Sequence, residues 1–171
     1  MNGQPETNLT RAQLWAIVIL RVLIGWHFLY EGIAKLSLPS WSASGFLLQS
    51  RGPFAGFFHG LAGNPAALAN VSLMTMWGLV AIGLGLIVGC LTRTAAGSGI
   101  LLIMLIYLCN PPFVGYFYSI PMEGSYLVVN KNLVEAAGLL VIALTNTGQV
   151  AGIDRLIHGL VRGRRTRLAN A

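Results

Sequence analysis

Charged residues are scarce in this chain, and their scarcity limits what kind of protein it can be. Only 9% of the 171 residues are Asp, Glu, Lys or Arg, whereas 55% are hydrophobic and the mean hydropathy is +0.69. A soluble domain has about a quarter of its residues charged, which is what keeps its surface in water. The composition therefore excludes an ordinary soluble domain and favours an integral membrane protein in contact with the lipid bilayer.

Acidic residues are rarer still, with 5 Asp and Glu against 11 Lys and Arg, for a net charge of +6. The last segment holds five of the arginines: Arg155, Arg162, Arg164, Arg165 and Arg167. A basic tail can bind nucleic acid, but after a hydrophobic chain the positive-inside rule favours a cytoplasmic topology signal. We therefore expect a cytoplasmic C-terminus and no nucleic-acid partner.

Cysteine and histidine, the usual ligands of redox centres, are also few, with 2 and 3 copies. Cys90 is expected at the cytoplasmic end of the second span and Cys109 at the outer end of the third, most of a bilayer apart, whereas a disulfide needs Cα atoms within about 7 Å. The histidines, His27, His59 and His158, are expected at different depths, which disfavours a bis-histidine haem. His27 and Glu31 could hold a metal, but two ligands do not define a site. No metal, haem or flavin site is evident in the sequence.

Long apolar runs are what the chain has in place of charge. Four of them approach the roughly 20 residues that cross a hydrocarbon core, at 12–36, 71–91, 94–110 and 131–147. Only helices satisfy the backbone of such segments in lipid. We predict an all-α membrane protein, a single domain over residues 1–171 built as a four-transmembrane-helix bundle.

The basic segment 148–171 then forms a cytoplasmic tail, and an even number of spans places the N-terminus on the same side. The loops 37–70 and 111–130 lie outside. Phe54, Phe57, Phe58 and Leu61 recur at helical spacing, which predicts an amphipathic helix in the first outer loop. Glycines in the second span indicate a close packing face.

Ionisable residues interrupt two of the spans in a matching order. His27, Glu31 and Lys35 follow one another at intervals of four, so they share a face of the first helix. Lys131 and Glu135 open the last helix, also four apart. Because these two helices run in opposite directions, each places a Lys at the outer rim and a Glu about 6 Å deeper.

Two interpretations of these charges remain open. Glu31–Lys35 and Lys131–Glu135 are either local ion pairs whose lysines extend to the interface, or the walls of one outward-facing polar pocket floored by His27. In the pocket, Glu31 would pair with Lys131 and Glu135 with Lys35. Arg21 lies deeper, and we expect it to extend to the cytoplasmic headgroups, with a buried role as the alternative.

Three blocks of the chain, "LRVLIGWHFLYEGIAKL", "GLGLIVGCLTRTAAGSG" and "YLVVNKNLVEAAGLLVIAL", resemble the DoxX/DoxD family of small four-helix bacterial membrane proteins. The resemblance covers roughly residues 20–144, and the outer loop is similar to the DoxD branch, which includes the large subunit of thiosulfate:quinone oxidoreductase. The family's matched positions are Glu31, Lys35, Arg93, Asn130, Lys131 and Glu135. The resemblance implies the bacterial inner membrane as location and a membrane quinone as cofactor.

The function that follows is a quinone-linked redox subunit, with a second subunit or further copies as partner. Glu31, Glu135 and His27 would be its catalytic residues, binding the quinone ring and carrying protons. Lys35, Lys131, Arg51 and Asn130 would bind substrate, with Arg51 or Lys131 attracting an anionic donor. The alternative is a non-enzymatic membrane scaffold or a small-solute carrier, so whether the chain is an enzyme stays open.

Overall fold

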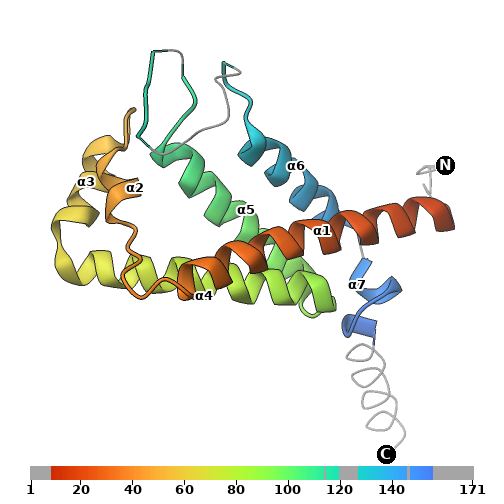
Figure 1. Ribbon diagram of the computed structural model, residues 1–171. Helices are drawn as coiled ribbons and strands as arrows, with labels where there is room; N and C mark the ends of the chain where they lie inside the picture. The colour runs from red at the N-terminus through yellow and green to blue at the C-terminus, as the bar shows by residue number, and fades with distance from the viewer. Residues whose placement is uncertain (1–8, 114, 120–126, 146, 156–171) are drawn as a thin grey trace, which may run out of the picture.

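The computed structural model describes residues 9–113, 115–119, 127–145 and 147–155, and within these ranges every regular element is helical (Figure 1). Seven helices occur there: α1 (Arg11–Leu36), α2 (Ser44–Leu48), α3 (Ala55–Gly63), α4 (Pro65–Val88), α5 (Thr92–Cys109), α6 (Lys131–Leu144) and α7 (Thr147–Val150). The predicted all-α membrane fold is confirmed. Residues 156–171, most of the predicted basic tail, lie outside the described residues.

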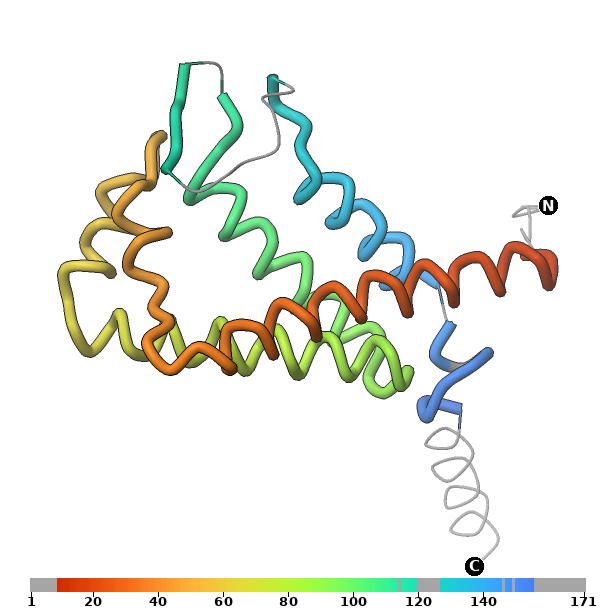
Figure 2. Tube along the Cα trace, in the orientation of Figure 1, coloured from red at the N-terminus to blue at the C-terminus, as the bar shows by residue number. Residues whose placement is uncertain are grey.

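α1 and α4 form a tightly packed antiparallel pair along most of their length (Figure 2). The pair is close because glycines face each other: a Cβ atom on Gly83 would lie 2.5 Å from the backbone nitrogen of Leu29 and 2.7 Å from the carbonyl oxygen of Gly25. Small residues let helix backbones approach in this way in lipid, where packing rather than hydrophobicity drives association. Of the glycines in the second span, Gly83 packs on α1, whereas Gly85 faces Ala95 of α5.

α5 and α6 form a second helix pair, and the core lies where this pair crosses the first. The most deeply buried apolar side chains come from all four long elements: Phe28, Leu86, Ile103 and Leu139. The turn between α4 and α5 is tight, with Gly89 at φ 70° and Leu91 at φ 49°. Gly89 adopts the left-handed conformation that ends α4, a role that glycine fills without steric cost.

α2 and α3 together form a cap over one end of the bundle (Figure 1). Ala43, Leu47 and Phe58 of this region bury their side chains with Cys109 at the end of α5. α3 is the helix that the phenylalanine spacing predicts in the first outer loop; Phe58 and Leu61 pack inward, whereas Phe54 and Phe57 are exposed. We call this end of the molecule the cap end.

The long helices agree with the predicted spans, with two differences. α4 begins at Pro65 rather than 71, because Asn64 caps it by accepting from the backbone nitrogens of Ala66 and Ala67. α1, α4 and α5 are long and apolar enough to cross a membrane. α6 has only 14 residues, about 21 Å against a hydrocarbon core of about 30 Å. A span at 131–147 therefore stays a proposal.

Hydrogen bonds hold the chain after α6 against the α4–α5 turn. The carboxylate of Asp154 accepts from the backbone nitrogen of Leu91 at 2.7 Å and from the nitrogen and hydroxyl of Thr92 at 3.0 and 2.8 Å. These backbone nitrogens belong to the start of α5, where a helix has donors without partners. Asp154 thus caps α5 from a distant part of the sequence.

Arg21 lies beside these hydrogen bonds of Asp154 and is 1% exposed. Its Nη2 donates to the carbonyl oxygen of Ala151, and the charge of Asp154 acts on it. Gly89 makes room, since a Cβ there would lie 3.1 Å from Nη2. The expectation that Arg21 extends to the headgroups is wrong, because its side chain is buried and donates to the carbonyl oxygen of Ala151, while its Nε and Nη1 have no hydrogen-bond partner among the described residues.

Candidate functional site

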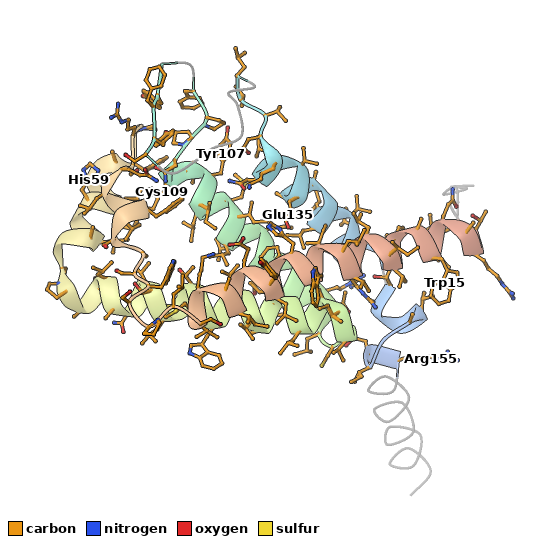
Figure 3. The ribbon with its side chains drawn as sticks, in the orientation of Figure 1. Trp15, His59, Tyr107, Cys109, Glu135 and Arg155 are labelled. Carbon is orange, nitrogen blue, oxygen red and sulfur yellow. The ribbon has the colours of Figure 1, made fainter. Side chains whose placement is uncertain are left out.

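α6 begins at Lys131 because Asn130 caps it: the Asn130 side chain accepts from the backbone nitrogen of Leu133 at 3.3 Å. This start fixes Glu135 one turn inside the helix, since four residues advance it by about 6 Å. Glu135 lies on the side of α6 that faces α1 (Figure 3). On α1 the side chain that meets it is His27.

His27 Nδ1 and Glu135 Oε1 lie 2.7 Å apart, the distance of a charge-assisted hydrogen bond. The carboxylate side chain is 13% exposed and the imidazole 48%. When Glu135 is ionised it accepts from Nδ1–H, which leaves Nε2 of the exposed ring to meet a ligand. We call His27 and Glu135 the dyad.

Glu31 and Lys35 pair with each other along α1 instead of across to α6. The Lys35 ammonium also lies 5.8 Å from the ring centroid of Trp41, so it links α1 to the residues packed under the cap. The expected pairing of Glu135 with Lys35 does not form. An i,i+4 spacing lets Lys35 reach its own helix, while His27 lies at the level of Glu135.

Lys131 is the first residue of α6 and acts electrostatically on both His27 and Glu31. Lys131 therefore lies near His27 and Glu31, and the ion pairs described at this site are His27–Glu135 and Glu31–Lys35. Asn130, the helix cap, is buried beside them.

A groove of about 710 Å³ separates α1 from α6 and contains the dyad. Its lining residues are Leu20, Leu23, Ile24 and His27 of α1, and Val129, Asn130, Lys131, Val134, Glu135 and Gly138 of α6 and the segment before it. The polar members gather at the cap end and the apolar ones continue along both helices. Leu23 and Val134 are 62% and 64% exposed, so the groove borders the surface that lipid would cover.

The apolar half of this groove could not be recognised from the sequence. Leu20, Leu23, Ile24 and Val134 have the same residue types as the lipid-facing and core positions around them. Gly138 was the one hint, as a glycine three residues after Glu135 on the same helical face.

Arg51 does not belong to the groove. It is exposed, between α2 and α3, and acts electrostatically on Tyr118. Burial raises the pKa of the Tyr118 hydroxyl, which donates to the carbonyl oxygen of Pro111 at 2.7 Å, and the positive charge of Arg51 opposes that rise. Any meeting of Arg51 with a donor would occur at the cap, away from the dyad.

The part of the chain that the structure describes contains no group of three His, Cys, Asp or Glu residues placed to hold a metal ion. Cys90, in the turn between α4 and α5, and Cys109, at the far end of α5, are both free cysteines. The residues that line the groove therefore indicate which kind of ligand it suits. An apolar trough with a hydrogen-bonding dyad at one end fits a lipophilic molecule with a polar head.

Helices this apolar, with charges gathered in one inter-helix groove, define an integral membrane protein of the helix-bundle class. The chain belongs to the DoxX family, whose model matches residues 16–110. The match includes His27, Glu31 and Lys35 but ends before α6. No curated protein matches the chain, and no solved structure does.

Proposed function

We propose that the chain is a quinone-linked subunit of a membrane redox assembly and binds quinone in the groove between α1 and α6. The observation that carries this proposal is the dyad, with a 2.7 Å contact, at the end of an apolar groove bordering the lipid-facing surface. A quinone combines an isoprenoid tail with carbonyl oxygens that accept hydrogen bonds. It would supply the chemistry of a two-electron, two-proton acceptor.

The residues of the chain would bind and supply protons. His27 Nε2 lies on the side of the ring away from Glu135, so the imidazolium form can donate from Nε2 to a carbonyl of the quinone head. Glu135 holds the imidazole through Nδ1 and stabilises the imidazolium form, which is how a carboxylate orients a histidine for proton transfer. Lys131 adds positive charge at the cap end of the groove, close to His27.

The remaining expected site residues have narrower roles in this proposal. Glu31 and Lys35 neutralise each other and anchor α1 to the cap through Trp41. Asn130 starts α6 and so positions Glu135. Arg51 would at most attract an anionic electron donor at the cap. The electron carrier would belong to a partner subunit.

The topology of the proposal places the cap on the periplasmic side of the bacterial inner membrane and both termini in the cytoplasm. α1, α4, α5 and α6 would be its four spans, in one domain. The arginine-rich end of the chain supports this orientation through the positive-inside rule. The groove would then offer its polar end in the outer half of the bilayer.

Quinone binding to the purified protein in lipid nanodiscs tests the proposal. Trp26 is exposed next to His27, so its fluorescence should be quenched as decylubiquinone fills the groove, and Trp26→Phe should remove that signal. His27→Ala and Glu135→Gln should each weaken binding about 10- to 100-fold, the range for losing a charge-assisted hydrogen bond. Arg51→Gln is the matched control and should bind normally. Absence of saturable binding would leave the scaffold or carrier interpretation in its place.

A further inference from the structure

Gly138 forms the floor of the groove directly below the dyad. It lies three residues after Glu135, on the same face of α6, and lines the groove with it. Opposite stands Ile24 of α1, three residues before His27. A Cβ atom on Gly138 would lie 2.9 Å from Cδ1 of Ile24 and 3.9 Å from both terminal methyl groups of Leu20.

The glycine at this position does not serve close backbone packing. At Gly83, where α1 and α4 touch, an added Cβ would meet backbone atoms of Leu29 and Gly25. At Gly138 it would meet only the ends of side chains. The missing methyl group therefore makes room for the Ile24 side chain, which an added Cβ would push aside, instead of allowing two helix backbones to touch.

Gly138 lies where the polar end of the groove stops and its apolar part begins. From His27 to Leu20 the groove follows seven residues of α1, about 10 Å along the helix axis. Beyond the dyad its lining is apolar on both helices. A ligand with its head at the dyad would thus place the first carbons of an apolar tail against Gly138.

We propose that Gly138 is a specificity-determining residue that selects quinones with an isoprenoid tail over tailless quinones. This inference rests on the proposed quinone site. A branched isoprenyl unit is wider than a straight chain next to the ring, and a methyl group at position 138 would narrow the groove there by displacing Cδ1 of Ile24, which also lines it. The dyad recognises the head, whereas Gly138 and Ile24 recognise the start of the tail.

The chain offers a compensating pair of substitutions for the test. Gly138→Ala adds a methyl group where Cδ1 of Ile24 is 2.9 Å away, and Ile24→Val removes that Cδ1 atom. The double variant restores the volume of the floor with different atoms. Each variant is titrated in nanodiscs with two probes, a benzoquinone ring bearing one isoprenyl unit and the same ring without a tail.

We expect the wild type to bind the tailed probe at least about 10-fold more tightly, and Gly138→Ala to lose about that factor, the usual effect of one methyl group too many in an apolar pocket. The tailless probe should bind both proteins within about 2-fold, and Ile24→Val with Gly138→Ala should regain the tailed probe. Glu135→Gln should weaken both probes alike.

Three results would overturn the inference: an unchanged tailed affinity in Gly138→Ala, an equal loss for both probes, or no recovery in the double variant. A merely structural role would give the equal loss together with a lower melting temperature. If the wild type binds neither probe, the proposed quinone site itself is wrong. If it binds both equally, only the role of Gly138 fails.

Discussion

The imidazole of His27 and the carboxylate of Glu135 lie 2.7 Å apart, although 108 residues separate them in the chain. The contact joins α1 to α6, two helices that otherwise pack mainly on other partners. It is a connection between the two helix pairs as well as the polar centre of the groove. Removing this contact should therefore lower the stability of the protein even without a ligand.

A double-mutant cycle measures that connection. His27→Ala, Glu135→Ala and the double variant should show a coupling free energy of about 0.5–3 kcal/mol in thermal unfolding in detergent, the range for residues in direct contact. The sign should be stabilising, because the single variants each leave a polar group without its partner. Additive effects of the two substitutions would contradict the contact.

Lys35 should behave differently from the dyad, although both involve an ion pair on α1. Lys35→Met keeps the long stem over Trp41 and removes only the charge. Because Glu31 is partly exposed and the pair is local, the cost should be below about 1 kcal/mol. Quinone affinity should stay within about 2-fold of the wild type, far less than the effect of losing a charge-assisted hydrogen bond. A loss of binding as large as that of Glu135→Gln would place Lys35 in the site.

Glycines that look alike in the sequence should separate sharply when replaced by alanine. Gly83→Ala would push its methyl group into the backbone of α1, and should lower stability by about 1–3 kcal/mol or more, as overpacking does. Gly78→Ala, five residues earlier on α4, meets open space and should be neutral or stabilising by up to about 1 kcal/mol through helix propensity. Melting temperatures in one detergent compare them; equal losses would contradict the α1–α4 packing.

Topology is tested with cysteine probes on a background in which Cys90 and Cys109 are replaced. A cysteine at Gly45 in the cap should react with an impermeant reagent added outside intact cells. A cysteine at Arg155, beyond α7, should react only after the membrane is opened. The reverse pattern would invert the proposed orientation, and with it the side from which the polar end of the groove is reached.

The helices and the charged residues near the cap end were predictable from the sequence, because apolar length and a spacing of four are local properties. The pairing of those charges was not. Whether Lys35 reaches Glu31 or Glu135 depends on how α1 and α6 are rotated against each other, which the hydrophobic pattern of a lipid-facing helix leaves undetermined. The same uncertainty concealed the apolar half of the groove.

Arg21 and Asp154 illustrate a second reason why part of the structure could not be predicted from the sequence. The position of Arg21 along the first span allows its side chain to extend towards the lipid headgroups. No residue near it in sequence is an evident hydrogen-bonding or charged partner. Its partners come from the segment after α7, which folds back onto the α4–α5 turn. Such a contact follows from tertiary packing and has no signature along the chain.

That fold-back contact makes the stability of the protein depend on pH through Asp154. Burial alone would raise the pKa of its carboxyl group, but hydrogen bonds from Thr92 and Leu91, with the charge of Arg21, together lower the pKa below its ordinary value. The ionised form is thus favoured by folding. Its stabilisation is complete above the ordinary pKa of about 3.9 and is lost as the pH falls through the lower, folded value.

Asp154→Asn keeps the shape of the side chain and removes its charge. At pH 7 it should lower the free energy of unfolding by about 0.5–1.5 kcal/mol, the net value of one hydrogen bond, since one amide oxygen replaces the two carboxylate oxygens that accept from Leu91 and Thr92. The difference from the wild type should shrink as the pH falls below about 4, since the wild-type carboxylate is then protonated as well. Arg155→Gln, an exposed neighbour, is the control and should melt with the wild type at pH 7. A difference between Asp154→Asn and the wild type that stays constant down to pH 2 would mean that the charge of Asp154 does not hold the start of α5.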